Sequence, residues 1–245
     1  SAHLISRIGP QAVVDLASKM GIKSSLLPVP SLALGTSETT LLEMVSSFAT
    51  FAEYGIRRNA TVITSIQNRD GKVIAMFPSE PRRVLSEQTA FTMLNMMRKV
   101  IDNGTGSYIR TRFQVKGDLA GKTGTTQNNA DGWFIGMHPD LVVGAWVGFN
   151  DPRVSFQSDY WGQGAHNALL LVGDFLKTAT EGHSTYLKRS RFTAPEGYRY
   201  PSKPVYSKSL QTSTKKSNIL DLAPSKVTPK TSSPTPIPLL LRSDS

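Results

Sequence analysis

Three short apolar runs between residues 115 and 149 most restrict what this 245-residue chain can fold into. The runs cover residues 115–120, 133–137 and 141–149, and only His138, Pro139 and Asp140 separate the second from the third. Short apolar runs bounded by turn-forming residues are typical of β-strands joined by tight turns. The sequence therefore predicts that strands follow one another here without an intervening helix.

A segment rich in glycine and threonine lies after the first run: Gly121, Lys122, Thr123, Gly124, Thr125 and Thr126. Its lysine supplies a positive charge, its threonines supply hydroxyl donors, and its glycines let a ligand come close to the backbone. Together these groups predict an anion-binding ledge.

Two kinds of site use such a ledge. A nucleotide-binding P-loop needs a glycine, four residues and then Gly-Lys-Ser/Thr, and it opens a helix. Here the upstream Gly117 is one residue too close, and turn residues and a strand follow the motif. The Lys-Thr-Gly element of serine acyltransferases that act on penicillin and D-alanyl peptides lies instead on an edge strand. The order strand, motif, turn, strand favours the acyltransferase element over a nucleotide-dependent enzyme.

Composition and charge argue against several other classes of protein. The chain contains no cysteine, so disulfides and thiolate chemistry are excluded. The net charge is +10, but the basic residues are scattered and many lie in the tail, so we expect a solvated basic tail and no nucleic-acid partner. No apolar stretch approaches the roughly 20 residues that span a bilayer, and nothing resembles a signal peptide. We also expect no metal and no cofactor.

Apolar residues at helical spacing predict helices over residues 2–8, 8–20, 41–52, 86–101 and 165–178. The broad apolar stripe of 41–52 predicts a buried helix. The strand-like runs 61–67 and 72–77 flank Asp70 and Gly71, which predicts a hairpin. We interpret the turn-rich residues 103–107 as a helix stop, and we expect Gly144 and Gly148 to let helices pack closely on the sheet.

The domain organisation follows from a change in composition near residue 200. Residues 1–180 carry the periodic elements, residues 181–200 form a C-terminal extension, and residues 201–245 are rich in Ser, Thr, Pro and Lys. Such a composition cannot bury enough apolar surface to order itself. The sequence therefore predicts a disordered tail over 201–245.

Three stretches together resemble the C-terminal part of the transpeptidase domain of class A, bifunctional penicillin-binding proteins. They are residues 31–38 with the helix after them, residues 121–126, and residues 131–136 followed by 146–148. The resemblance covers about residues 1–180. It implies an α/β (α+β type) fold with an antiparallel sheet of about five strands and helices on both faces. It also implies incompleteness at the N-terminus, since the chain begins inside a helical segment.

The resemblance implies a two-step acyl transfer. A serine attacks the penultimate D-alanine carbonyl of a peptidoglycan stem peptide, and an amine of a neighbouring peptide then resolves the acyl-enzyme. Stem peptides and β-lactams would be the ligands, at the periplasmic face of the bacterial inner membrane if the chain is joined to a missing N-terminal part. By this resemblance Lys122 and Thr125 are catalytic, and the residues that bind substrate are Thr123, Gly124, Thr125 and Thr126.

The family's nucleophile motif is the main departure. The one Ser-x-x-Lys match is Ser213 to Lys216, inside the tail, and no Ser-x-Asn is present. We therefore expect a penicillin-binding protein fragment that is inactive alone, because the covalent route needs its serine. The alternative is a non-catalytic remnant or binding subunit that pairs with an N-terminal fragment or other envelope proteins.

Overall fold

The computed structural model describes residues 1–151, 153–180 and 190–200, all within one compact unit, Ser1–Tyr200. Its helices are α1 (Ala2–Ile8), α2 (Pro10–Lys19), α3 (Leu41–Ala52), α4 (Glu87–Asn103), α5 (Tyr108–Thr111) and α6 (Ala168–Thr180), with short 3-10 turns η1 (Pro30–Leu34) and η2 (Gln127–Asn129). Its strands are β1 (Ile56–Arg57), β2 (Ser65–Gln67), β3 (Val73–Met76), β4 (Arg82–Arg83), β5 (Ala120–Thr125), β6 (Asp131–His138) and β7 (Leu141–Gly148). The predicted tail lies outside the described residues.

The five predicted helices are confirmed, within a few residues at their ends. The short helix α5 was not predicted, because the turn-rich residues 103–107 were interpreted only as the end of the preceding helix. In the structure the stop and α5 form one compact turn, in which the Gly106 N–H donates to the Val100 carbonyl at 2.9 Å.

The main sheet is antiparallel, with the strand order β5-β6-β7. The described residues supply three of the five or so strands that the resemblance implies for the complete sheet. The predicted strand over 115–120 is wrong: β5 begins only at Ala120. Gly117 has a φ of 118°, which breaks the extended path just before the motif. The glycine-threonine motif is itself the strand.

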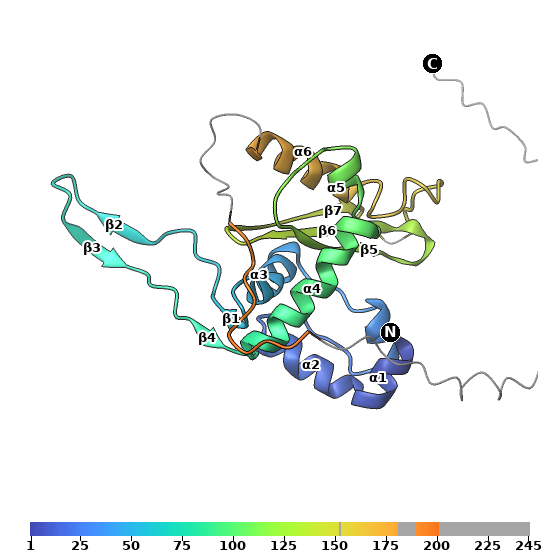
Figure 1. Ribbon diagram of the computed structural model, residues 1–245, viewed down its shortest axis with the longest axis horizontal. Coiled ribbons are helices and arrows are strands. Elements are labelled where there is room, and N and C mark those ends of the chain that lie inside the picture. Colours follow the sequence, from blue (N-terminus) through green and yellow to red (C-terminus); the bar gives the residue numbers. More distant parts are fainter. Residues whose placement is uncertain (152, 181–189, 201–245) are drawn as a thin grey trace, which may run out of the picture. The chain divides into compact units, whose positions relative to one another are not determined.

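Helices cover both faces of this sheet (Figure 1). An added Cβ at Gly144 would lie 2.6 Å from Val45 of α3, and one at Gly136 would lie 3.5 Å from Val172 of α6. Gly136 pairs with Val143, the neighbour of Gly144, so the two glycines point to opposite faces. Gly144 therefore has the predicted role. Gly148 does not, because its close neighbours are sheet side chains.

Each face has its own hydrophobic core. The α6-side core is built from Ile101, Ile109, Phe113, Val115, Leu119, Phe134, Ala145, Ala168, Leu169, Val172 and Leu176. The α4-side core is built from Ala52, Phe91, Leu94, Met97, Ala120, Met137 and Phe192. Both cores bury side chains of the sheet, which fixes the position of β5.

Helix α3 is less buried than its sequence suggested. Leu42 is 63% exposed, so the breadth of the apolar stripe overstated the burial of this helix. Its start is well defined: Thr40 and Glu43 form a capping box. The Glu43 carboxylate also accepts hydrogen bonds from the backbone of Lys23 and from the backbone and hydroxyl of Ser24. Glu43 thus ties the loop after α2 to the start of α3.

The predicted hairpin is confirmed as β2 and β3, and it extends away from the sheet (Figure 1). Its strands are shorter than predicted, and neither contributes a residue to the two cores. Apolar side chains on it are exposed, among them Ile74 at 67% and Met76 at 69%.

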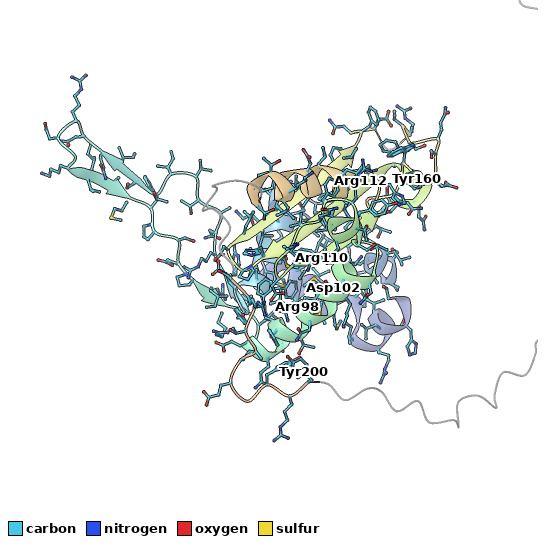
Figure 2. The ribbon with its side chains drawn as sticks, turned by 45° about the horizontal axis from the view of Figure 1, so that its top comes forward. Arg98, Asp102, Arg110, Arg112, Tyr160 and Tyr200 are labelled. Atoms are coloured by element: carbon cyan, nitrogen blue, oxygen red, sulfur yellow. The ribbon has the colours of Figure 1, made fainter. Side chains whose placement is uncertain are left out.

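Residues 190–200 pack on helix α4. Arg98 of α4, which is labelled in Figure 2, forms a two-pronged ion pair with Asp118 and also donates to the Phe192 carbonyl at 3.0 Å. The Phe192 N–H donates to the Asp118 carboxylate at 2.9 Å. The Tyr198 ring packs edge-on against Phe91 at 4.8 Å. The Arg98–Asp118 pair therefore joins three segments that are far apart in the sequence.

Replacing Arg98 should destabilise the protein. Its side chain is 20% exposed and that of Asp118 is 16% exposed, so Arg98→Ala leaves a mostly buried carboxylate without its partner. We expect a loss of about 3 kcal/mol in the free energy of unfolding, measured with denaturant. Arg153→Ala is the matched control, because the Arg153 side chain is 88% exposed in its pair with Asp151. Equal effects of the two substitutions would contradict this role.

The contribution of Glu43 to stability should depend on pH. Hydrogen bonds from the Ser24 hydroxyl and from the Thr40 and Lys23 backbone lower the pKa of Glu43 from 4.5 to about 2. The folded state thus favours the carboxylate, and this stability is complete above pH 4.5 and is lost as the pH falls toward 2. We expect the difference in melting temperature between the native chain and Glu43→Gln to shrink over this interval. A melting-temperature difference that stays constant with pH would refute the pH-dependent contribution of Glu43 to stability.

Candidate functional site

Strand β5 lies at one edge of the main sheet, as the motif predicted. Beyond its end, the Thr126 N–H donates to the Asp131 carbonyl at 3.2 Å, so Thr126 and Asp131 face each other across the turn. In an antiparallel ladder, alternate residues turn their backbone groups toward the partner. The N–H and C=O groups of Thr123 and Thr125 therefore point to the outer edge, where a ligand can reach them.

Lys122 places its ammonium group over this edge. Its Nζ donates to the Thr123 carbonyl at 2.6 Å, and its side chain is exposed. Side chains alternate along β5, so Lys122 and Gly124 face the α4 side while Thr123 and Thr125 face the α6 side. The Lys122 ammonium can therefore approach the Thr123 and Thr125 hydroxyls only if its side chain crosses the edge of the strand. Its contact with the Thr123 carbonyl directs it across that edge.

The hydroxyl of Thr125 is held in a defined position. The Gly164 N–H donates to its Oγ1 at 3.1 Å. Because that contact uses a lone pair, the hydroxyl proton is left to donate to a ligand. Thr123 has a different partner: its Oγ1 lies 2.7 Å from the Thr105 Oγ1 in the loop after α4.

Gly164 can make this contact because it lies directly over the strand pair. An added Cβ would lie 2.3 Å from the Gly124 carbonyl oxygen and 2.4 Å from that of Trp133. Any side chain would push the loop away from the sheet. Gly124 is also closely packed, with the Trp133 Cβ 3.1 Å from the position of an added Cβ.

Thr126 closes the turn after the strand. Its hydroxyl accepts from the Asp131 N–H at 2.9 Å and lies 3.3 Å from the Asp131 carbonyl. The Asp131 carboxylate accepts from the Trp146 indole at 2.9 Å. The structure thus brings Lys122, Thr123 and Thr125 to one edge, and it engages the Thr126 hydroxyl in the turn.

Sequence reasoning missed Thr105 and Gly164. Thr105 belongs to the loop that was interpreted as a helix stop, and Gly164 lies 39 residues beyond Thr125. No local spacing connects either residue to the motif. The only signal was the pair of glycines at 162 and 164, which is typical of close backbone approach.

Two further findings bear on chemistry. Across residues 1–151, 153–180 and 190–200, no cluster of His, Asp or Glu side chains could hold a metal ion. In the same part of the chain, every helix is too short or too polar to cross a membrane. The Ser213 to Lys216 match lies outside the described residues.

Comparison with known sequences gives one consistent result. Residues 18–168 match the transpeptidase domain of penicillin-binding proteins. Penicillin-binding protein 1A of Neisseria meningitidis is 31% identical over 188 residues, which cover 74% of this chain and 23% of that protein. Penicillin-binding protein 1A of Aquifex aeolicus is 31% identical over 180 residues, which cover 74% of this chain and 24% of that protein. The chain spans about a quarter of the length of these relatives.

Solved structures share the fold. Penicillin-binding protein 1A from Haemophilus influenzae superposes with a TM-score of 0.69 at 22% identity, over 80% of this chain and 34% of that one. The Mycobacterium tuberculosis PonA1 protein in complex with penicillin V superposes with a TM-score of 0.58 at 23% identity, over 79% of this chain and 56% of that one. The chain therefore has the penicillin-binding transpeptidase fold and belongs to the family of penicillin-binding protein transpeptidase domains.

Proposed function

We propose that this chain provides the substrate-carboxylate side of a peptidoglycan D,D-transpeptidase site. The observation that carries the proposal is the outer edge of β5, where Lys122 and Thr125 meet outward-pointing backbone groups. A stem peptide ending in D-alanyl-D-alanine has an extended backbone and one terminal carboxylate. Both features match an edge strand that carries a cation and a hydroxyl donor.

In this proposal each residue of the β5 edge has a defined role. The Lys122 ammonium attracts the terminal carboxylate of the peptide and aids proton transfer among the site hydroxyls, and the Thr125 hydroxyl donates to that carboxylate. The Thr125 N–H at the strand edge forms half of the oxyanion hole for the carbonyl under attack. Gly124 leaves the edge open, and Thr123 is fixed by Thr105 beside it. Thr126 supports the edge by closing the turn.

The serine nucleophile comes from outside these 245 residues. The sequence holds no Ser-x-Asn, and its one Ser-x-x-Lys match lies in the tail composition of residues 201–245. We propose that a polypeptide segment carrying both motifs completes the site at the periplasmic face of the inner membrane. In the complete site, the serine oxygen bonds to the penultimate D-alanine carbonyl carbon, and the terminal D-alanine leaves with a proton on its amine.

Carboxylate binding by β5 can be measured without the serine. We expect an acetylated Lys-D-Ala-D-Ala peptide to shift the amide resonances of Thr123 and Thr125 in NMR titrations. Lys122→Ala and Thr125→Val should each weaken binding about tenfold, because each removes a hydrogen bond to a charged group.

Two matched controls accompany this titration. The same peptide with a C-terminal amide should bind weakly, and Thr61→Val, an exposed threonine near the hairpin, should change nothing. Equal binding of acid and amide would refute a carboxylate site on β5.

Covalent labelling tests the missing nucleophile. We expect the purified chain to remain unlabelled by a fluorescent penicillin, because its one Ser-x-x-Lys match lies in the tail composition of residues 201–245. Intact-mass measurement would detect an adduct on any side chain. An acylated serine within the 245 residues would show that the chain carries its own nucleophile.

A binding role is the second candidate, and the free edge of β7 favours it. Among the described residues, β7 pairs only with β6, and its eight residues include no Lys, Arg or Pro that would protect an edge. Helix α6 exposes Leu171 at 58% and Phe175 at 49%, four residues apart on one face. We propose that the segment carrying the serine adds strands at β7 and covers this face, which would complete the five-stranded sheet.

A further inference from the structure

Two aromatic side chains are exposed in the loop between β7 and α6. Tyr160 is 46% exposed and Trp161 is 51% exposed. Their rings meet edge to face, with 5.0 Å between centroids and 88° between planes. Tyr and Trp side chains are enriched at binding surfaces, and two that lie together in solvent form a small patch that a ligand can cover. We call this pair the aromatic ledge.

The aromatic ledge is held in place before any ligand arrives. The Tyr160 ring stacks on the His166 imidazole with 3.8 Å between centroids, and its hydroxyl lies 3.3 Å from that of Tyr108. The Trp161 carbonyl accepts from the Asn167 side chain at 2.8 Å. The backbone of the ledge is therefore fixed, and a ligand would lose little affinity to ordering it.

The ledge is anchored to the β5 edge on two sides. Gly164, three residues after Trp161, donates its N–H to the Thr125 hydroxyl. On the other side, Asn129 of the β5–β6 turn donates to Asp159 at 2.7 Å, and Gly162 packs directly on Asn129. Three residues span at most about 11 Å, and an extended five-residue peptide spans about 17 Å. One ligand can therefore reach both the Thr125 hydroxyl and the ledge.

Charge decides between the ligand groups that bind aromatic rings. An ammonium group binds the face of an indole through its positive charge. The Arg112 side chain, which carries a positive charge, lies on the same side of the molecule as Tyr160 in Figure 2. Asp159, the neighbour of Tyr160 in the chain, keeps its negative charge while it accepts a hydrogen bond from Asn129, and it offsets the positive charge of Arg112. Because charges of both signs lie beside the aromatic ledge, we favour a neutral partner, such as the C–H face of a pyranose ring.

We propose that Tyr160 and Trp161 form a sugar subsite that stacks on a pyranose ring of the glycan strand carrying the stem peptide. This inference rests on the proposed function, since β5 binds the other end of the same substrate. It gives the site a preference for peptide attached to glycan over free peptide. The sugar contact also positions the donor strand along the β5 edge.

The test uses the full chain and three probes. They are a peptide-free tetrasaccharide of N-acetylglucosamine, a stem pentapeptide, and the same pentapeptide attached to N-acetylmuramic acid. We expect the tetrasaccharide to shift the indole N–H resonance that disappears in Trp161→Phe. We expect the muramyl peptide to bind about fivefold more tightly than the bare peptide. Trp161→Ala should remove that advantage and leave bare-peptide binding unchanged.

A control variant and the contrary outcomes complete the design. Phe77→Ala removes an aromatic side chain of similar exposure, 46%, beside the distant hairpin. It should change the affinity for neither the tetrasaccharide nor the muramyl peptide. If the bare peptide binds and the muramyl peptide binds no more tightly, the subsite is overturned but the proposed function stands. The same holds if the higher affinity of the muramyl peptide persists in Trp161→Ala. A tetrasaccharide shift without any peptide binding supports the subsite and overturns the proposed carboxylate site.

Discussion

The hydrogen bonding of the central strand β6 to both neighbours is the constraint on which the rest of the structure depends. Most of the β6 side chains are buried, with Phe134 and Met137 completely inaccessible, so this strand must pair on both edges. Pairing with β5 uses one set of β5 backbone groups and directs the other set outward. The same ladder that stabilises the fold therefore creates the outward-facing edge of β5 at which we propose that substrate binds.

The fold can tolerate sequence change because backbone groups, rather than particular side chains, form much of the β5 edge. The Haemophilus influenzae structure superposes with a TM-score of 0.69 although identity is 22%. The β5 edge offers backbone groups that do not depend on side-chain identity, and only a few positions need a defined residue type. Gly164 is one, because its close approach to Gly124 and Trp133 excludes a side chain.

The sequence predicted local features well and distant contacts poorly. The helix over residues 86–101 and the Asp70-Gly71 turn depend on neighbours in the chain, so both were predictable. The edge position of the motif was expected from its likeness to the Lys-Thr-Gly element, since the strand pattern alone does not fix the order of strands in a sheet. The contacts of Thr105 and Gly164 with the motif, and the packing of Phe192 on α4, depend on folding over long sequence separations. No periodicity reports such contacts.

The separation of the β2–β3 hairpin from both cores has a consequence for how this part of the chain can vary. Its strands hold each other by their own ladder, and Gly71 at the tip has open space around it. Residues can thus be added or removed near the tip without changing the packing around β5, since loop closure costs rise only slowly with length. The hairpin is the segment where changes in length are tolerated most easily, and a reporter peptide inserted there would leave the edge of β5 undisturbed.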